Sequence, residues 1–358
     1  MTTVNFLNRQ YTELTGAVHN HTEYSHDCDV KIEKILIAAK ENRLDYLTLN
    51  DHHSVYPETE LNKALGSFKS KKGYKPIVIL GTELNDPKKQ HHLLIFDSHF
   101  TEERKEIEEY LEEYEKRDSL MFAAHPYEER ASNKYPLYIW EKTDLLERLD
   151  GLEIWNYASS WLSKLNPTTN GILMYLFPHT FVRKPFPKSI VLWDNLNLKG
   201  LRKSAIGSTD AHSTVKRYGF LKLKILTHKY LFGTVRTNVL LPEGSPVDNS
   251  SILTALAKGN SYIVNYKTGY PLKFYAGIGN IDGEGVSFGE EIKWSEGLHF
   301  YYHLPNDAKV ILFHNGRQVA VQREGYGSFP IKEKGFYRLH VERFGATWII
   351  TNNIYVVD

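Results

Sequence analysis

Short apolar runs recur through the first two thirds of the chain, and each is followed by a polar stretch. Between the first two runs, apolar residues repeat with the spacing of one helix face, at Ile32, Ile35, Leu36 and Ala39. Residues 101–117 are a second candidate helix, because Thr101 and two glutamates suit a helix N-terminus. The runs with the length of buried strands are 16–18, 46–49, 77–80, 93–96, 120–124, 152–155 and 204–208. This alternation predicts an α/β fold with a parallel sheet, either a β/α barrel or a doubly wound sheet.

The last third has a different pattern. A helix is expected at 250–258, and short strands separated by Gly, Asn and Asp then follow. The Asn-Gly pair in HNGR at 314–317 is a hairpin signal. The strands are expected at 272–276, 298–303, 309–313, 335–341 and 347–357. We therefore predict two domains, a β/α barrel over 1–268 and a smaller antiparallel, β-sandwich-like domain over 269–358. Residues 158–203 are interpreted as a long insertion that forms a lid or a substrate wall.

Composition narrows the function classes. The chain has 358 residues, and its 44 basic and 43 acidic residues give a net charge of +1. We expect no general nucleic-acid binding from such a balance. Neither a signal peptide nor a membrane span is visible, and the lone Cys28 cannot form an internal disulfide, so a cytoplasmic location is expected. Sixteen histidines are the unusual feature.

The positions of these histidines suggest a metal centre. Nine of the sixteen stand near predicted strands, together with acidic residues: His19, His21, His26, His52, His53, His91, His92, His125 and His212. Carboxyl ends of barrel strands converge on one mouth, which would bring these groups together. Imidazole and carboxylate without thiolate suit Zn, Mn or Fe, and the ligands are too many for a closed structural zinc site. The pattern predicts a polynuclear metal site.

Five motifs resemble those of the PHP (polymerase and histidinol phosphatase) superfamily, in the expected order. They are HNHTEYSHD at 19–27, LNDHHS at 49–54, GTELN at 81–85, AAHPY at 123–127 and STDAH at 208–212. The resemblance implies a distorted seven-stranded β/α barrel, three divalent ions and phosphoesterase-type hydrolysis by hydroxide that the ions activate. The tail is similar, more loosely, to the branch of PHP proteins with a C-terminal β domain.

The resemblance also implies a ligand set. His19, His21, Glu83 and Asp210 would hold the first ion; Glu83, His92 and His125 the second; Asp27, His52 and His212 the third. At two places a neighbour competes. His26 competes with Asp27, which we favour because the motif ends in the acid. His91 competes with His92, which we favour because it directly precedes the strand.

Supporting roles remain open at this point. His53 and Glu153 are candidates for protonating the leaving group or positioning water, or they only orient ligands. Anchors for the ligand imidazoles are sought in Asp51, Thr22 or Ser208, and phosphate contacts in Arg183, Lys184 or Arg202. The favoured function is a phosphoesterase for a small phosphorylated molecule. Hydrolysis of a carbamate, ester or amide at the same centre is the alternative, and a non-enzymatic scaffold is the third reading.

Overall fold

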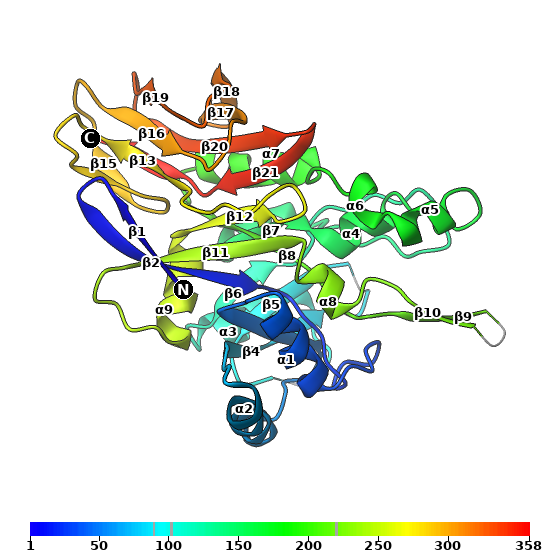
Figure 1. Ribbon diagram of the computed structural model, residues 1–358. Helices are drawn as coiled ribbons and strands as arrows, with labels where there is room; N and C mark the ends of the chain where they lie inside the picture. The colour runs from blue at the N-terminus through cyan, green and yellow to red at the C-terminus, as the bar shows by residue number, and fades with distance from the viewer. Residues whose placement is uncertain (89, 101–102, 219–220) are drawn as a thin grey trace.

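The computed structural model describes residues 1–88, 90–100, 103–218 and 221–358 of the chain. A large mixed β-sheet with flanking helices dominates it, and a separate four-stranded antiparallel sheet lies in the C-terminal part (Figure 1). The protein therefore has the mixed α/β architecture that the alternating apolar and polar stretches predict.

Seven neighbouring strands of the large sheet come from the first two thirds of the chain. In sheet order they are β2 (Arg9–Ala17), β3 (Tyr46–His52), β4 (Ile77–Asn85), β5 (His92–Phe96), β6 (Leu120–Ala123), β7 (Gly151–Asn156) and β8 (Ser204–Ser208). The neighbouring pairs are parallel, except that β5 is antiparallel to both β4 and β6. All residues of β5, β7 and β8 are buried, including Glu153 and Asn156 of β7 and the two serines of β8.

The prediction of a parallel sheet is wrong at β5. Only residues 86–91 separate β4 from β5. A parallel crossover needs a dozen residues or more, whereas a short connection turns the chain back as a hairpin. The start of β5 therefore lies at the edge where the parallel strands end.

The two ends of this seven-strand run meet. The backbone N–H of Thr209 donates to the carbonyl of Val18 at 3.2 Å, and the N–H of His21 donates to the carbonyl of Ala211 at 3.1 Å. Asn20 and Ala211 form an isolated parallel bridge. The residues that follow β8 thus lie beside those that follow β2, so the strand ends surround one rim.

The predicted helix faces are buried, although one boundary differs. In α1 (Ile32–Glu41) the predicted apolar face is buried. The helix expected from Thr101 begins only at Ile107, as α3 (Ile107–Glu115), and Thr101 itself lies outside the described residues. Residues 103–106 are all charged, so the helix starts where its apolar face starts. The remaining helices of the barrel part are α2 (Glu58–Lys72), the 3-10 helix η1 (Thr143–Arg148), α8 (His228–Leu231) and α9 (Asn249–Lys258).

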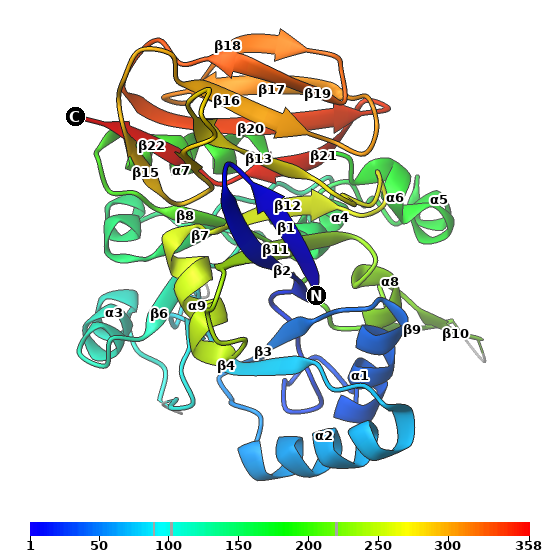
Figure 2. The same cartoon turned by 60° about the vertical axis from the view of Figure 1, so that its left-hand side comes forward.

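The expected insertion is mostly helical. It contains α4 (Tyr157–Leu162), α5 (Gly171–Leu176), α6 (Pro178–Phe181) and α7 (Pro187–Leu198). In both views α5 projects on the same side of the molecule as the hairpin of β9 (Val215–Tyr218) and β10 (Leu221–Lys224) (Figures 1 and 2). None of the helices in the described ranges is long and apolar enough to cross a membrane.

The C-terminal strands continue the large sheet rather than standing apart from it. Next to β2, which forms a hairpin with β1 (Thr2–Phe6), the order runs β11 (Val235–Pro242), β12 (Ser261–Asn265), β21 (Ala346–Thr351), β20 (Gly335–Arg343), β22 (Ile354–Val357) and β15 (Glu291–Lys293). The hairpin of β17 (Lys309–His314) and β18 (Arg317–Gln322) pairs with β20. The separate sheet has β14 (Gly285–Val286), β13 (Tyr275–Gly279), β16 (His299–His303) and β19 (Tyr326–Pro330). A shared core that includes Phe300, Phe329, Leu339 and Ile349 joins the two sheets.

In this region the structure confirms the predicted hairpin and corrects the bounds of two predicted strands. The Asn-Gly hairpin is confirmed, because Asn315 and Gly316 both have the positive φ, 48° and 76°, that a two-residue turn of this kind requires. The strand expected at 272–276 begins at Tyr275, because Lys273 takes a left-handed turn with φ 60°. The strand expected at 347–357 is broken at Asn352, whose side chain pairs with the backbone of Ala205 at 2.8 and 2.9 Å.

Candidate metal centre

Metal-capable side chains gather where the carboxyl ends of the parallel strands meet. The reversal of β5 puts its first residue at the same rim. Ligand-capable side chains therefore come from the carboxyl ends of the parallel strands, from the start of β5 and from the loops that follow the strands. All nine predicted ligands are brought together here: His19, His21, Asp27, His52, Glu83, His92, His125, Asp210 and His212.

Three of these residues have a left-handed backbone, which is rare for residues other than glycine. The φ angles are 62° at His19, 27° at His125 and 51° at Asp210. Such conformations cost on the order of 1–3 kcal/mol each and persist only where the surroundings hold them. The N–H of His19 donates to Oγ1 of Thr48 at 3.0 Å, and that of His125 donates to Oε2 of Glu153 at 2.7 Å. The backbone strain therefore lies at residues whose side chains point into the cluster.

Glu83 is the hub of the cluster and is only 1% exposed. Its Oε1 lies 2.7 Å from Nδ1 of His92 and 3.3 Å from Nε2 of His125. Its Oε2 lies 3.0 Å from Nε2 of His19 and 3.3 Å from Nε2 of His21. The same oxygen lies 3.2 Å from Nδ1 of His52, the last residue of β3. One carboxylate therefore faces five imidazoles.

The buried charges shift the pKa values of their neighbours. Burial lowers the pKa of His19, but Glu83, Asp210 and Glu153 outweigh it and raise that pKa well above the ordinary value. Burial raises the pKa of Glu83, and nearby imidazoles, His52 and His19 foremost, hold it well below its ordinary range.

The first of three groups with metal-ligand spacing contains His19, His21, Glu83 and Asp210. Each offers one ligand atom, and these atoms lie within 4.8 Å of one another. Oδ1 of Asp210 is 3.5 Å from Nε2 of His19 and 3.3 Å from Nε2 of His21. This group has the same members as the set that the family resemblance assigns to the first ion.

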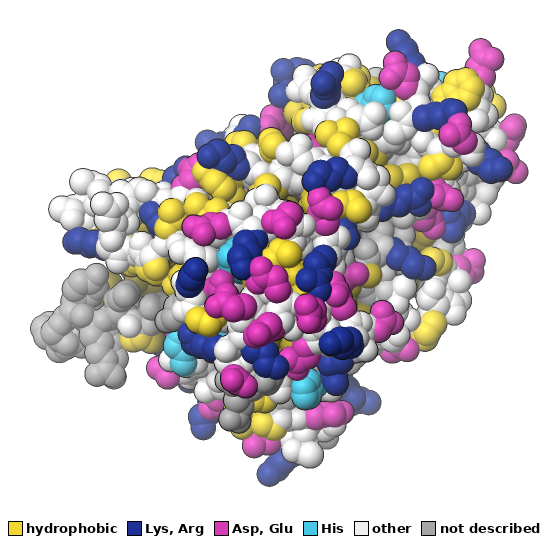
Figure 3. Space-filling view, turned by 180° about the vertical axis from the view of Figure 1, so that it is seen from behind, with side chains coloured by type: hydrophobic (Ala, Val, Ile, Leu, Met, Phe, Trp, Pro, Cys, Tyr) yellow, Lys and Arg dark blue, Asp and Glu magenta, His cyan; other side chains and the backbone are white. Residues whose placement is uncertain are grey.

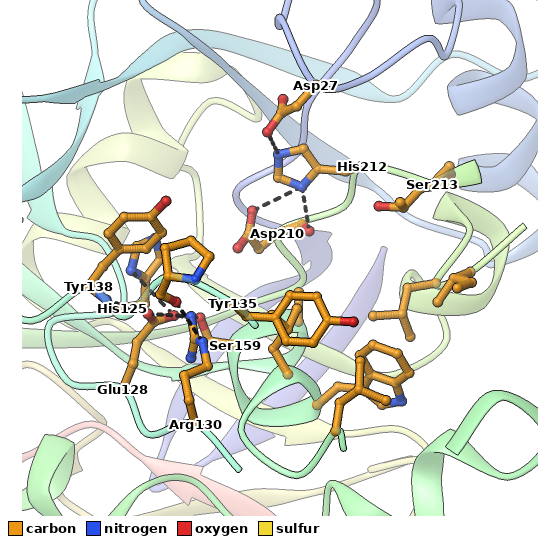
Figure 4. Close-up of a pocket in the computed structure, with 18 of the residues that line it drawn as sticks. Asp27, His125, Glu128, Arg130, Tyr135, Tyr138, Ser159, Asp210, His212 and Ser213 are labelled. Carbon is orange, nitrogen blue, oxygen red and sulfur yellow. Dashed lines mark hydrogen bonds and ion pairs between the residues drawn. The ribbon is translucent and has the colours of Figure 1, made fainter. Parts of the chain in front are cut away.

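The second group contains His21, Asp27, His52 and His212. Oδ2 of Asp27 lies 3.4 Å from Nε2 of His52 and 3.2 Å from Nε2 of His212 (Figure 4). His26 is exposed, and its ring centroid lies 5.0 Å from that of His52. The geometry therefore favours Asp27 over His26, and it adds His21 to the three residues assigned from the resemblance.

Replacing Asp27 by alanine is expected to remove one bound ion, because a carboxylate that faces two imidazoles is lost. His26→Ala is the matched control and should keep the full metal content. Metal content per chain, measured by mass spectrometry after dialysis, distinguishes the two variants. Equal losses in both would show that His26 shares the ion.

The third group contains His52, Glu83 and His92. His125 approaches the same Glu83 oxygen as His92, and its pKa, which burial lowers, is raised to about 9 by the hydrogen bond to Glu83 and the charge of Glu128. The resemblance assigns Glu83, His92 and His125 to one ion, and the structure brings His52 to that position as well.

The neighbouring His91 points away from the cluster. Its Nδ1 lies 2.6 Å from Oδ2 of Asp86, and its Nε2 accepts from the backbone N–H of Lys142 at 3.2 Å. Both ring nitrogens are therefore used elsewhere, as expected for adjacent strand residues that face opposite sides.

A His92→Ala and His91→Ala pair tests this difference. The loss of His92 is expected to weaken binding of one ion by about 10- to 100-fold or more, which is at least the effect of losing a group that only supports a ligand. His91→Ala should keep metal affinity and instead lower the melting temperature, because the buried Asp86 loses its partner. Metal titrations and thermal melts of both variants check this. A loss of metal affinity in His91→Ala alone would reverse the assignment.

Unpaired ring nitrogens indicate that cations fit this cluster. A carboxylate has about four lone-pair sites, fewer than the five imidazoles around Glu83. Divalent ions between these groups would accept both kinds of lone pair, and the set of imidazoles and carboxylates suits Zn, Mn or Fe. Within the described ranges, the buried nitrogens that lack a well-aligned hydrogen bond include ring nitrogens of five candidate ligands: Nε2 of His21, His92 and His212, and Nδ1 of His52 and His125.

Glu153 lies behind the ligands. Its Oε1 lies 2.9 Å from Nδ1 of His19, and its Oε2 accepts from the N–H of His125 at 2.7 Å and from Nδ2 of Asn156 at 2.9 Å. It is 1% exposed and is not part of the cavity wall described below. This carboxylate orients two candidate ligands.

His53 is held beside the cluster rather than in it. Its Nε2 lies 2.9 Å from Oδ1 of Asn85, and among the described residues that line the cavity Asn85 is present whereas His53 is not. Burial lowers the pKa of His53. The imidazole is therefore expected to be neutral at pH 7.

The expected anchors of the ligand imidazoles are different residues. Asp51 accepts from the N–H and the hydroxyl of Thr22, at 2.5 and 2.7 Å, and so fixes the loop after His21 rather than a ring. Ser208 has no hydrogen-bond partner for its Oγ within the described chain. Ser25, which sequence reasoning overlooked, lies 3.3 Å from Nδ1 of His21, and only its place inside the first motif pointed to it.

The cluster opens into a cavity of about 820 Å³. Figure 4 shows Asp27, His212 and Asp210 in one group and His125, Tyr138, Glu128 and Arg130 in another. Glu128 is 2% exposed; it accepts from Arg130 at 2.6 Å and from the hydroxyl of Ser159. Sequence reasoning found His125 but missed Glu128, Arg130 and Tyr138, because the run EER at 128–130 has the pattern of an exposed charged loop.

The basic residues expected to contact phosphate lie elsewhere. Arg183 donates to the carbonyl of Phe344, Lys184 pairs with Glu342, and Arg202 pairs with Glu291. All three contacts reach the C-terminal strands. Nothing in the spacing of the insertion marks these tertiary partners, so the expectation was wrong.

Comparison with known proteins agrees with the geometry. Residues 17–152 match the family model of the PHP domain. This part of the chain is similar to PHP domains. The matched range contains seven of the nine candidate ligands, and Asp210 and His212 follow beyond its end.

Solved structures with PHP-like domains are also similar, at low identity. One is a two-domain protein from Bacteroides vulgatus ATCC 8482 with a predicted PHP-like metal-dependent phosphoesterase; identity is 15%, the match covers 96% of this chain and 95% of that one, and the TM-score is 0.48. Another is a candidate metal-dependent phosphoesterase from Bifidobacterium adolescentis ATCC 15703, with 12% identity, coverage of 67% and 95%, and a TM-score of 0.39. No curated protein sequence matches the chain significantly.

Proposed function

We propose that this protein is a metal-dependent phosphoesterase that hydrolyses a small phosphorylated substrate at a centre of three divalent ions, Zn, Mn or Fe. The observation that carries the proposal is the position of Glu83, which faces five imidazoles at the edge of a cavity large enough for a substrate. The PHP-domain match supports the same reaction class.

The three groups of ligand-capable residues support three binding positions. His19, His21, Glu83 and Asp210 would hold one ion; Glu83, His92 and His125, with His52 near, the second; Asp27, His52 and His212 the third. Bound divalent ions would supply Lewis acidity and lower the pKa of water, and no protein nucleophile is then required.

The chain's own residues would then orient the candidate ligands and supply a proton to the leaving group. Glu153 would hold the ring of His19 and the backbone of His125 in place, which favours a positioning role over proton donation. His53 is hydrogen-bonded to the side chain of the cavity residue Asn85. From this place it would position a water molecule or transfer a proton close to Asn85. Arg130 and Arg104 line the cavity; because Arg130 donates to Glu128 and to the carbonyls of Glu129 and Pro136, Arg104 is the one that would face the anionic part of the substrate.

The mixed charge of one face offers no continuous basic surface to a polyanion. On the face in Figure 3, Lys and Arg side chains are interspersed with Asp and Glu over the described residues. Attraction of a phosphate would come from the ions and from Arg104 in the cavity. We also propose that β2–β8 form the seven-stranded barrel, with a domain boundary near 268 and residues 158–203 as the lid or wall.

A panel with one chromophore tests the reaction class. The protein is stripped with a chelator, reloaded separately with Mn, Zn or Fe, and assayed with 4-nitrophenyl phosphate, bis(4-nitrophenyl) phosphate, 4-nitrophenyl acetate and a 4-nitrophenyl carbamate. We expect at least one phosphate ester to be hydrolysed with a higher kcat/KM than the carbonyl compounds. Turnover should vanish in His125→Ala.

Two results would contradict the proposal. A preference for the carbamate or the acetate would identify a carbonyl hydrolase at the same centre. No turnover of any compound, with fewer than about one ion bound per chain after reloading, would favour the scaffold reading.

A further inference from the structure

The cavity has two unlike walls. The candidate ligands and the group around Glu128 form the polar wall (Figure 4). The opposite wall comes mainly from the insertion and is apolar: Trp161, Leu162, Leu165, Ile172, Tyr175 and Leu176. Leu223 in β10, and Ile225 and Leu226, which follow this strand, extend the apolar wall.

Burial along this wall changes from the core to the mouth of the cavity. Trp161 and Leu165 are 4% and 7% exposed, whereas Leu176 and Ile172 are 57% and 78% exposed. The indole N–H of Trp161 is used by the carbonyl of Met174 at 3.2 Å, so its ring faces the cavity as an apolar surface. Large apolar side chains left in water beside a cavity indicate a surface that a ligand covers.

The wall offers few partners for a polar substrate. Among the insertion residues that line the cavity, the polar side chains are those of Ser159 and Tyr175, and the hydroxyl of Ser159 already donates to Glu128. Few hydroxyl groups of a sugar or a nucleoside placed there would find a partner on this wall to replace the water that they lose, which is costly. An apolar group placed there would lose no hydrogen bonds to water and would cover the exposed apolar side chains of the wall.

We propose, resting on the phosphoesterase function above, that the substrate is amphipathic: a phosphoryl group at the metal centre, esterified to an alcohol with an alkyl chain or a fused aromatic ring system. The alcohol lies along α4, α5 and residues 223–226. Its size follows from the cavity, because about 820 Å³ is far more than a phosphate fills and is within the range of drug-sized ligand sites. The insertion is thus the specificity element of the site.

A series of n-alkyl phosphates tests this, because ethyl, butyl, hexyl and octyl alcohols are nearly equal leaving groups. Phosphate release by the metal-loaded protein is measured below the concentrations at which the esters aggregate. We expect kcat/KM to rise by about two- to fourfold for each added methylene until the wall is filled. Benzyl and 2-naphthylmethyl phosphate provide the ring arm, and glycerol phosphate the polar comparison. A steeper gain in one arm distinguishes a chain-shaped from a ring-shaped alcohol.

Two leucines of α5 form a matched pair of variants. Leu176 lines the cavity and is 57% exposed, whereas Leu173 is 54% exposed and does not line it. Leu176→Ser should flatten the dependence on chain length and weaken binding of octylphosphonate, measured by calorimetry. Leu173→Ser should change neither, and thermal melts confirm that both variants fold.

The outcomes separate this proposal from the function on which it rests. Phosphate release with a flat or falling dependence on chain length would overturn the amphipathic substrate and leave the phosphoesterase intact. Equal effects of the two leucine variants would place the apolar contact on the outer surface, as on a lipid aggregate, and would overturn the cavity as its site. No phosphate release from any ester would overturn the proposed function, and this inference with it.

Discussion

Replacing Glu83 by glutamine is expected to lower kcat/KM by about a thousandfold or more and to reduce the bound metal by at least one ion per chain. The amide keeps the size of the side chain but loses the charge that faces five imidazoles. Glu83 belongs to two of the three candidate groups, whereas Asp27 and Asp210 belong to one each, so its effect should exceed that of either aspartate. Metal analysis and steady-state kinetics on the same preparation measure both effects.

The control is another buried glutamate. Glu13 lies in β2, before the candidate ligand His19, and accepts from Nδ2 of Asn238 at 2.9 Å and from the hydroxyl of Tyr262. Glu13→Gln should alter stability without altering metal content or kcat. If Glu83→Gln kept full metal and near-normal turnover, the hub role of Glu83 would be wrong.

Removal of the ions by a chelator should abolish turnover and lower the melting temperature by roughly 5 to 10 °C. Ligand at about 100 times its Kd stabilises the folded state by about 2.7 kcal/mol, and each kcal/mol shifts the melting point of a domain of this size class by about 2–4 °C. Without ions the left-handed backbone at His19, His125 and Asp210 loses part of its support. Scanning calorimetry before and after reloading measures the shift.

Glu83→Gln again supplies the comparison, because its melting temperature should respond less to added metal. Turnover that persisted in protein with under about a tenth of an ion per chain would exclude metal catalysis. A melting temperature that did not change with metal would mean that the ions are not held by this buried cluster.

Local chemistry made much of the candidate centre predictable from the sequence. Apolar runs indicated buried strands, and a histidine or carboxylate at the end of each run indicated a shared rim. The face of α1 and the Asn-Gly hairpin at Asn315 followed from spacing alone. These features depend on residues that are close in the chain, so one sequence was enough.

Features that depend on distant partners were not predictable. The reversed β5 depends on a hairpin connection. The place of His92 directly before the predicted strand favours it over His91, but the contacts of His91 with Asp86 and the backbone of Lys142 are not visible in the sequence. Arg183 and Arg202 resemble free cations until the C-terminal strands pack against them. The apolar wall likewise exists only once the insertion folds over the rim.

Anomalous diffraction from crystals of the protein reloaded with zinc or manganese tests the central claim most directly. The account predicts three peaks above the anomalous background: one among His19, His21 and Asp210, one beside His92 and His125, and one among Asp27, His52 and His212. Glu83 should lie between the first two. Absence of peaks at this cluster, or metal bound only elsewhere on the chain, would contradict the account.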